Sequence, residues 1–316
     1  MHIYPLVMEP SYRHGPETPW GGHALHDAFN KKTPDAKTGE SLEVSTLPSH
    51  ESHILNGEYR GKTLQDVFRL WKDKLTGKKE DRFPLMLKLL DAQQCLSVQV
   101  HPDDRYALAH EGKLGKSEAW YILNAMPGAK LVYGVDTHGE DLRSVLDSGR
   151  LEECLHWVSV HPGDVFYIPS GTIHALGPGI QCYEIQESSD VTYRLWDWGR
   201  TGKDGKPRQL HTKQAIDVSN TVPVQERKGT EKRLSFDGNG SLLVDDPHFQ
   251  LFSVDLKEEV TLPGGKMQFV TATMACTMHW DNEEQIIAPF QSVLVPAHMP
   301  SVRFSGNGRL LVSRVV

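Results

Sequence analysis

The sequence has little that would place it in a membrane or on a nucleic acid. No apolar run among its 316 residues approaches the ~18 residues of a membrane-spanning helix. The formal net charge is −7, whereas binding to a phosphate backbone requires a basic surface, and no basic stripe is visible. We therefore expect no membrane span and no nucleic-acid partner. A small anionic ligand is still compatible with this charge, because it needs only a few local cations.

Cysteine is scarce as well. Cys95, Cys154, Cys182 and Cys276 are far apart in apolar sequence and form no C-x-x-C pair. This pattern is typical of reduced thiols, not of a disulfide framework or a cysteine metal site. The first ten residues also lack the basic start, apolar core and cleavage site of a secretory signal. We therefore expect a cytoplasmic protein.

Short strand-like segments, separated by Gly and Pro turns, make up most of the chain and predict a mainly β protein. Three segments instead place apolar residues at helical spacing, and we expect helical insertions over about 63–76, 103–111 and 141–155. Glu40 and Glu43 fall on or beside a short strand, where we expect both carboxylates to face solvent.

The chain is long enough for two domains. Residues near position 225 are charged and follow a segment rich in Gly, Lys and Asp, which is typical of a linker. We therefore predict a catalytic domain over 1–225, carrying the helical insertions, and a C-terminal β domain over 226–316.

An internal repeat supports two related domains. Residues 162–174 align without gaps with 289–301, since both have a proline, a polar pair, four strand residues and a second proline. The alignment places His174 opposite Ser301. The second unit therefore has no metal ligand at that position, and we expect it to be a degenerate, structural copy.

One segment concentrates potential metal ligands. Residues 96–104 read L-S-V-Q-V-H-P-D-D, in which Ser97, Gln99 and His101 alternate with valines. Alternation with a period of two places these three side chains on one face of a strand. An amide oxygen and an imidazole directed into one space suit a metal ion. Taken alone, the pattern is also compatible with a half-buried strand that faces solvent.

A second segment has the spacing of a known metal-binding motif. Gly163, Pro169 and His174 match the second cupin motif, in which a glycine turn and a proline precede a histidine. The first cupin motif, H-x-H followed by Glu, matches less well. Gln99 stands at the first histidine position, and the nearest suitable acid, Glu118, lies beyond an insertion. The last motif position, usually Asn, is Pro178.

Together these motifs identify a family. The chain resembles the type I mannose-6-phosphate isomerases (phosphomannose isomerases), in their short bacterial form. The resemblance rests on W-G-G at Trp20, L-S-V-Q-V-H-P-D-D from Leu96, G-K-S-E-A-W from Gly115, P-S-G-T-I-H-A-L from Pro169 and S-S-D-V-T-Y-R from Ser188. It covers most of residues 15–200 and, more loosely, the rest. The longer family members have Pro and Tyr where this chain has Ser117 and Leu176.

The resemblance implies two cupin-type jelly-roll β-barrels and one Zn²⁺ per chain. The implied zinc ligands are Gln99, His101, Glu118 and His174. One carboxylate, two neutral imidazoles and one amide oxygen would leave the ion a net positive charge and room for substrate oxygens.

The implied reaction interconverts mannose 6-phosphate and fructose 6-phosphate by proton transfer through a cis-enediol. Glu184 and Asp190 are alternative candidates for the base or for the group that orients it, and the sequence does not separate them. Arg194 is expected near the reacting oxygens or the phosphate, because its planar fork suits either anion. Lys116, on the same strand face as Glu118, is a candidate catalytic or phosphate-binding residue.

Further substrate contacts are expected from Ser97, which shares the face of Gln99, and from Lys88. A lysine in the apolar run P-L-M-L-K-L-L is costly to bury unless it is paired. Trp196 and Trp198 share a face and are expected in the core or at a barrel rim. We expect a monomer or a weak homodimer.

Two other functions are compatible with a metal-binding cupin. An Fe²⁺ or Mn²⁺ oxygenase is disfavoured, because such sites usually have more histidine ligands or an open facial triad. A non-catalytic sensor of sugar phosphates would need the metal ligands, but not Glu184, Asp190, Arg194 and Lys116 together. The combined residues therefore favour the isomerase.

Overall fold

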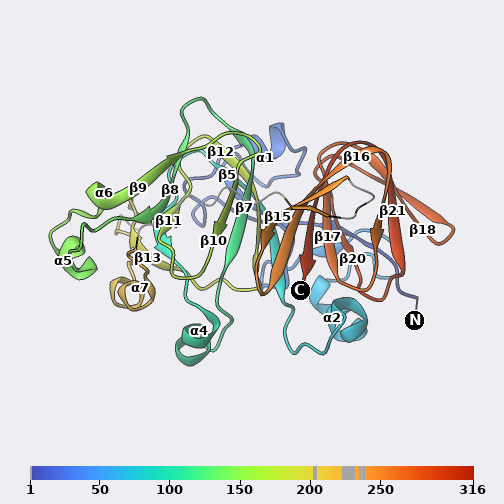
Figure 1. Ribbon diagram of the computed structural model, residues 1–316, viewed down its shortest axis with the longest axis horizontal. Helices are drawn as coiled ribbons and strands as arrows, with labels where there is room; N and C mark the ends of the chain where they lie inside the picture. Colours follow the sequence, from blue (N-terminus) through green and yellow to red (C-terminus); the bar gives the residue numbers. More distant parts are fainter. Residues whose placement is uncertain (1, 202–204, 223–231, 235, 237–238) are drawn as a thin grey trace.

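A computed structural model describes residues 2–201, 205–222, 232–234, 236 and 239–316. Strands dominate it and form two lobes that lie side by side (Figure 1). One lobe contains mainly residues from the first two thirds of the chain, and the other contains the C-terminal strands. The mainly β class predicted from the sequence is confirmed. No helix in the described part of the chain is long and apolar enough to cross a membrane.

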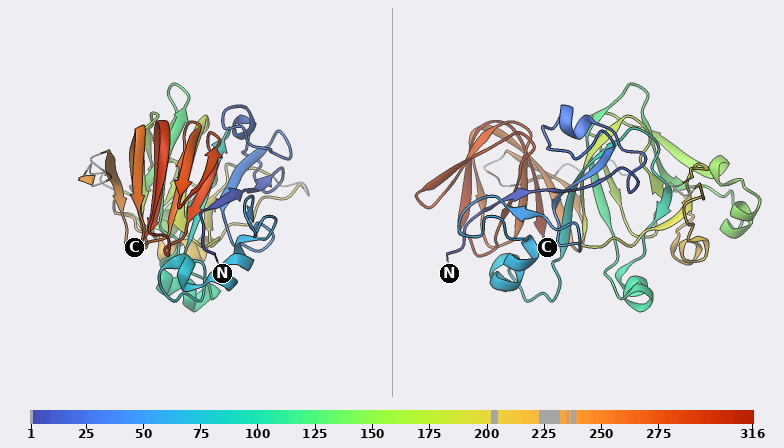
Figure 2. Two further views of the ribbon diagram at one scale, coloured as in Figure 1. Left: turned by 90° about the vertical axis from the view of Figure 1, so that its right-hand side faces the viewer. Right: turned by 180° about the vertical axis from the view of Figure 1, so that it is seen from behind.

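The helices are short and lie at the periphery of the two lobes (Figures 1 and 2). They are α1 (Ala24–Asp27), α2 (Leu64–Trp71), α3 (Asp73–Thr76), α4 (Asp104–Glu111), α5 (Leu142–Asp147), α6 (Leu151–Cys154) and α7 (Thr212–Val218). All three predicted helical segments are present, two of them divided into a pair of helices. The first divides at Lys72, whose φ of 48° ends α2. Neither α1 nor α7 was predicted.

A six-stranded antiparallel sheet forms one wall of the first lobe, in the order β10-β7-β12-β5-β3-β2. Its strands are β2 (Ser11–His14), β3 (Thr38–Val44), β5 (Leu85–Ala92), β7 (Glu118–Ala125), β10 (Val165–Ile168) and β12 (Ile180–Glu187). Every residue of β3, β5 and β12 is buried. This sheet is therefore covered on both faces.

A five-stranded sheet forms the opposite wall, in the order β13-β6-β11-β8-β9. Its strands are β6 (Val98–Val100), β8 (Lys130–Val135), β9 (Leu155–Ser159), β11 (His174–Ala175) and β13 (Tyr193–Trp196). Helices α5 and α6 lie at the far end of this lobe (Figure 1).

The second lobe is a ten-stranded sheet that curls over on itself. It contains β1 (Leu6–Glu9), β4 (His53–Ile54), β14 (Lys232–Leu234), β15 (Gly240–Asp245), β16 (Phe249–Pro263), β17 (Gln268–Ala272), β18 (Cys276–Trp280), β19 (Glu283–Ile287), β20 (Ser292–Val295) and β21 (Ser301–Val315). Strand β21 pairs with β18 through its first half and with β17 through its second. Gly306, the last residue paired with β18, and Gly308 have φ of 141° and 129°, which favour glycine where β21 changes partner.

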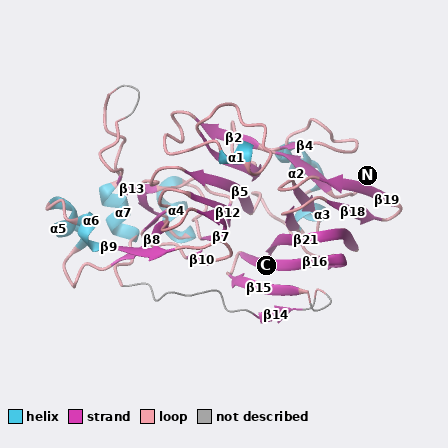
Figure 3. Cartoon of the chain, turned by 90° about the horizontal axis from the view of Figure 1, so that it is seen from above, coloured by secondary structure: helices cyan, strands magenta, loops and turns pink. Residues whose placement is uncertain are grey.

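The two lobes are not strictly consecutive in the chain. Strand β1 pairs with β20, so the N-terminal strand belongs to the C-terminal sheet. Figure 3 shows the N-terminus on the same side of the molecule as the C-terminal strands β18 and β19. The apolar face of α2 packs into the same core as the C-terminal strands. The boundary expected near residue 225 lies outside the described residues, and the division at that point stays a prediction.

The internal repeat corresponds to equivalent strands. Strand β10 covers Val165–Ile168 and β20 covers Ser292–Val295, the same four positions of the alignment. Strands β11 and β21 then begin at the aligned residues His174 and Ser301. His174 is fully buried, whereas Ser301 is exposed. Only the first unit of the repeat therefore directs a histidine inward.

Candidate active site

Three potential metal ligands from different strands meet inside the first lobe. Glu118 begins β7, His174 begins β11, and His101 follows directly after β6. Glu118 Oε1 lies 3.1 Å from His174 Nε2, and Glu118 Oε2 lies 3.7 Å from His101 Nε2. All three side chains are buried. The contact between Glu118 and His174 connects the two sheets across the interior of the lobe.

Backbone contacts orient both imidazoles. His101 Nδ1 is 2.8 Å from the carbonyl oxygen of Val191, and His174 Nδ1 is 2.8 Å from that of Thr172. Each Nδ1 therefore carries a proton and donates it, while the Nε2 of each ring faces Glu118. A backbone acceptor behind each ring is the arrangement usually found for metal-binding histidines.

Gln99 lies next to this group. Its Cα pairs with that of His174 across the β6–β11 ladder, and its amide nitrogen is 3.4 Å from His174 Nε2. Rotating the side-chain amide of Gln99 by 180° exchanges its nitrogen and oxygen, and this places the oxygen next to His174 Nε2 instead. Gln99 also pairs with Arg194 on the other side, in the β6–β13 ladder. One row across the five-stranded sheet thus contains His174, Gln99 and Arg194.

The charges in this group suit a cation. Burial alone would raise the pKa of Glu118, but Lys116 and His174 outweigh burial and hold that pKa well below its usual value. Burial and Lys116 hold the pKa of His101 well below its usual value, so this imidazole is neutral, the form that binds metals. Lys116 Nζ lies 2.6 Å from Glu118 Oε2 and 3.0 Å from His101 Nε2.

The donor set fits a divalent metal ion. Both oxygens of Glu118 are fully buried; Lys116 forms an ion pair with Oε2, but neither oxygen accepts a well-aligned hydrogen bond. Buried polar atoms normally have such a partner. With two imidazoles and one amide nearby, these oxygens form the set of donors that zinc prefers.

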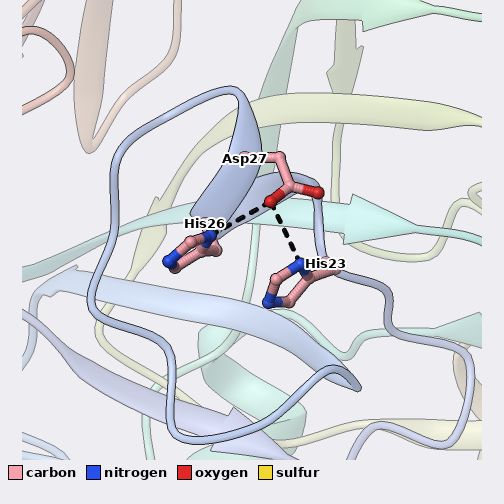
Figure 4. A group of neighbouring side chains, drawn as sticks. All are labelled: His23, His26 and Asp27. Atoms are coloured by element: carbon pink, nitrogen blue, oxygen red, sulfur yellow. Dashed lines mark hydrogen bonds and ion pairs between the residues drawn. The ribbon is translucent and has the colours of Figure 1, made fainter.

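A different His and Asp group lies on the surface, at α1. His23 Nδ1 and His26 Nδ1 lie 3.1 and 3.0 Å from the same Asp27 oxygen (Figure 4). These three side chains are exposed, and exposed acidic groups of this kind are common without a metal ion. The buried group is therefore the stronger candidate for a resident metal.

A cavity of about 260 Å³ lies beside the buried group. Lys88 projects into it from β5, and its Nζ is 3.2 Å from Glu184 Oε1 and 3.4 Å from Glu40 Oε2. Trp120 Nε1 donates a 2.7 Å hydrogen bond to Glu184 Oε2. Lys88 is thus buried in ion pairs with two carboxylates. Glu184 faces the cavity, and the Trp120 indole holds one of its oxygens.

The cavity wall also contains most of the other predicted residues. Ser97, Gln99, Lys116, Asp190 and Arg194 all line it. Arg194 donates from Nη1 to the carbonyl oxygen of Gln209, at 2.8 Å, while its Nε is buried without a hydrogen-bond partner. Burial and the charge of Arg208 lower the pKa of Arg194. Asp190 lies at the edge of the cavity and pairs with Lys113 at 2.6 Å.

Comparison with known proteins identifies the family. The model of the type I phosphomannose isomerase catalytic domain matches residues 13–121. The mannose-6-phosphate isomerase ManA of Bacillus subtilis is 35% identical over 320 residues, which cover 100% of both chains. The chain belongs to the type I phosphomannose isomerase family.

Solved structures agree. The crystal structure of the mannose 6-phosphate isomerase from Bacillus subtilis has a TM-score of 0.91 and 32% identity, and covers 98% of this chain and 99% of that chain. A mannose 6-phosphate isomerase described as bound with zinc and yttrium shares the fold, with a TM-score of 0.77, at 16% identity over 98% of this chain and 99% of that one. The family resemblance and the assignment as an isomerase are confirmed.

The cavity also includes residues that the sequence analysis did not select. Arg13, Glu17, Trp20, Glu40 and Arg208 are among its lining residues. The expectation that Glu40 and Glu43 face solvent is wrong, because both are buried. Glu40 faces the cavity, and Arg13 lies directly opposite it on β2. Side chains alternate along residues 38–44, so the sequence could indicate that Glu40 and Glu43 lie on opposite faces of the strand. Alternation could not show that both faces of the sheet are covered by other parts of the protein.

The paired tryptophans are structural. Trp196 and Trp198 pack against a buried cluster of the first lobe, and Trp198 Nε1 donates to the carbonyl oxygen of Leu96 at 2.6 Å. Neither lines the cavity. All four cysteines are free thiols, and three are buried.

Proposed function

We propose that this protein catalyses the reversible isomerisation of mannose 6-phosphate to fructose 6-phosphate with one Zn²⁺ per chain. The observation that supports this most strongly is the buried group of His101, Glu118 and His174 beside a cavity that also contains a carboxylate, a lysine and an arginine. The names of the curated relatives support the choice of substrate.

Gln99, His101, Glu118 and His174 would hold the zinc ion. When bound, Zn²⁺ supplies Lewis acidity that stabilises negative charge developing on the C1 and C2 oxygens of the sugar. The neutral state of His101 and the ionised state of Glu118 suit this role. The solved relative described with bound zinc supports the choice of metal.

Glu184 is our candidate for the proton transfer between C1 and C2. A general base must lie within hydrogen-bond reach of the proton that it removes. Glu184 lies inside the cavity, and Trp120 fixes one of its oxygens so that the other faces Lys88 and the cavity. Asp190 lies at the cavity edge, where its carboxylate already forms an ion pair with Lys113. We therefore propose that Asp190 helps to shape the entrance of the cavity.

Arg194 is our candidate for holding an anionic oxygen of the substrate. Its Nε is buried without a partner, and its guanidinium has Arg208 nearby. A phosphate or an enediolate oxygen would compensate this positive charge through paired N–H donors. Ser97 offers a hydroxyl in the same wall, while Lys116 offers a cation beside Glu118.

A non-catalytic sensor of sugar phosphates is the second candidate. It would need the same metal ligands and cations, but it would not need a carboxylate fixed inside the cavity. The hydrogen bond from Trp120 to Glu184 therefore favours the enzyme.

The test is a coupled assay of fructose 6-phosphate formation from mannose 6-phosphate on protein of measured metal content. We expect activity to disappear on chelation and to return with zinc. Arg194→Ala should keep its zinc and lose turnover, whereas Arg303→Ala, at an exposed ion pair, should behave as wild type. Bound zinc without turnover in the wild-type protein would support the sensor instead.

A further inference from the structure

The segment that presents Lys116 and Glu118 has a buried serine at its centre. Because side chains alternate along an extended chain, Ser117 points away from the metal ligands that its neighbours approach. Ser117 is 5% exposed. Its backbone N–H donates to Glu187 Oε1 at 2.8 Å, and its hydroxyl lies 3.2 Å from that same oxygen. The position of Ser117 therefore determines the directions in which the side chains of Lys116 and Glu118 point.

A carboxylate from the other lobe reaches the same hydroxyl. Asp246 lies in the turn between β15 and β16, and its Oδ2 is 3.1 Å from Ser117 Oγ. Tyr167 donates its hydroxyl to that same oxygen at 2.6 Å. Tyr167 belongs to β10 and pairs with Ala119 on β7. Asp246 therefore connects the C-terminal sheet to the two adjacent strands at the metal group.

Asp246 is itself held firmly. It is 4% exposed, and its Oδ1 accepts a 2.8 Å hydrogen bond from the backbone N–H of His248. His248 Nδ1 lies 3.4 Å from Glu187 Oε2, the carboxylate that also binds Ser117. Two side chains from one turn of the C-terminal lobe thus reach the Ser117–Glu187 contact.

We propose that Asp246 is a positioning residue, through which the C-terminal lobe holds Ser117 and thereby keeps Glu118 and Lys116 in metal-binding geometry. This inference rests on the proposed metal function of Glu118. It gives the C-terminal lobe, which contributes no metal ligand of its own in the described residues, a defined part in the active site. Outer partners of metal ligands typically contribute ~10–100-fold to metal affinity.

The test measures zinc release from the loaded protein to a chromogenic chelator, together with kcat, KM and the unfolding midpoint. Asp246→Ala and Ser117→Ala should each accelerate zinc release by roughly tenfold. Because both substitutions break the same contact, the double variant should be little faster than either single variant. Asp245→Asn is the matched control, since Asp245 is the neighbouring residue at the end of β15 but is exposed.

Asp246→Asn, which keeps the size of the side chain, provides a second variant if Asp246→Ala fails to fold. We expect it to release zinc faster than wild type and to lower kcat more than it changes KM. Release at the wild-type rate in folded Asp246→Asn and Ser117→Ala would overturn the inference, as would fully additive effects. A wild-type protein that binds no zinc would instead overturn the proposed function.

Discussion

Lys88 of β5 lies directly opposite Glu184 of β12, with its Nζ 3.2 Å from Glu184 Oε1. The same Nζ is 3.4 Å from Glu40 Oε2, on the strand at the other side of β5. One buried cation is thus shared by two buried carboxylates in the wall of the active-site cavity. The charge state and the stability of this wall therefore depend largely on Lys88, with Arg13 as a second cation beside Glu40.

Replacing that lysine should be costly. Lys88→Met leaves Glu40 and Glu184 without this cation, and removing one partner of a buried ion pair typically destabilises by about 3–5 kcal/mol. We expect a loss of this size in urea unfolding, and a loss of turnover. Lys78→Met is the control, since Lys78 forms an exposed pair with Glu80 and should cost less than about 1 kcal/mol. Equal effects of the two substitutions would contradict the role given to Lys88.

The pairing of Glu40 also predicts a dependence on pH. Burial would raise the pKa of Glu40, but Lys88 and Arg13 outweigh it and hold that pKa below the usual 4.5. A lowered pKa means that the ionised group contributes stability above its unfolded pKa, and that this stability is lost as pH falls through the folded pKa. Wild type should therefore exceed Glu40→Gln in unfolding free energy by a constant amount from about pH 6 to about pH 8. The difference should shrink below pH 4.5, and a difference that persists there would contradict this account.

Zinc should stabilise the fold independently of catalysis. A ligand that binds only the folded state at a hundred times its Kd adds about 2.7 kcal/mol to the unfolding free energy. We expect zinc to raise the unfolding midpoint of chelator-treated wild type, and to have little effect on His174→Ala. His161→Ala is the control, because His161 is exposed and does not belong to the buried group. A midpoint that rises equally in His174→Ala would place the metal elsewhere.

Local patterns, together with the family resemblance, predicted which side chains lie at the centre of the candidate site. Gln99 and His101 share a strand face because of alternation alone, and the same rule placed Lys116 beside Glu118. His174 followed from the spacing of its glycine and proline. In the structure these side chains lie within a few ångströms of one another, as the motifs indicated.

Local patterns could not predict that both faces of the six-stranded sheet are covered at β3. Glu40 and Glu43 lie on opposite faces of β3, and the expectation assumed that polar residues on a short strand meet water. Instead Glu40 faces the cavity, while Glu43 meets Ser292 of the C-terminal sheet. Strand alternation is the same whether a face meets water, a cavity or a second lobe. Similarly, α1 has only four residues, too few for a helical period to show.

A buried network connects the two lobes on the outer face of β3. Glu43 is fully buried and accepts hydrogen bonds from Ser41 and Ser292, at 2.6 and 2.9 Å. Lys31 Nζ lies 2.7 Å from Glu43 Oε1 and donates to the carbonyl oxygen of Phe290 at 2.7 Å. Both the charge and the donors around Glu43 are therefore satisfied, and the network is not part of the cavity wall.

Breaking this pair should weaken the fold while leaving the active site intact. Lys31→Met leaves the Glu43 carboxylate buried without its cation, and we expect a loss of about 3–5 kcal/mol in urea unfolding. Under folding conditions, zinc retention and kcat should equal those of wild type, because Lys31 does not line the cavity. Glu259→Gln, at the exposed pair with Arg303, is the control and should cost less than about 1 kcal/mol. Loss of turnover in folded Lys31→Met would mean that the contact between the lobes also sets the geometry of the cavity, beyond the part given to Asp246.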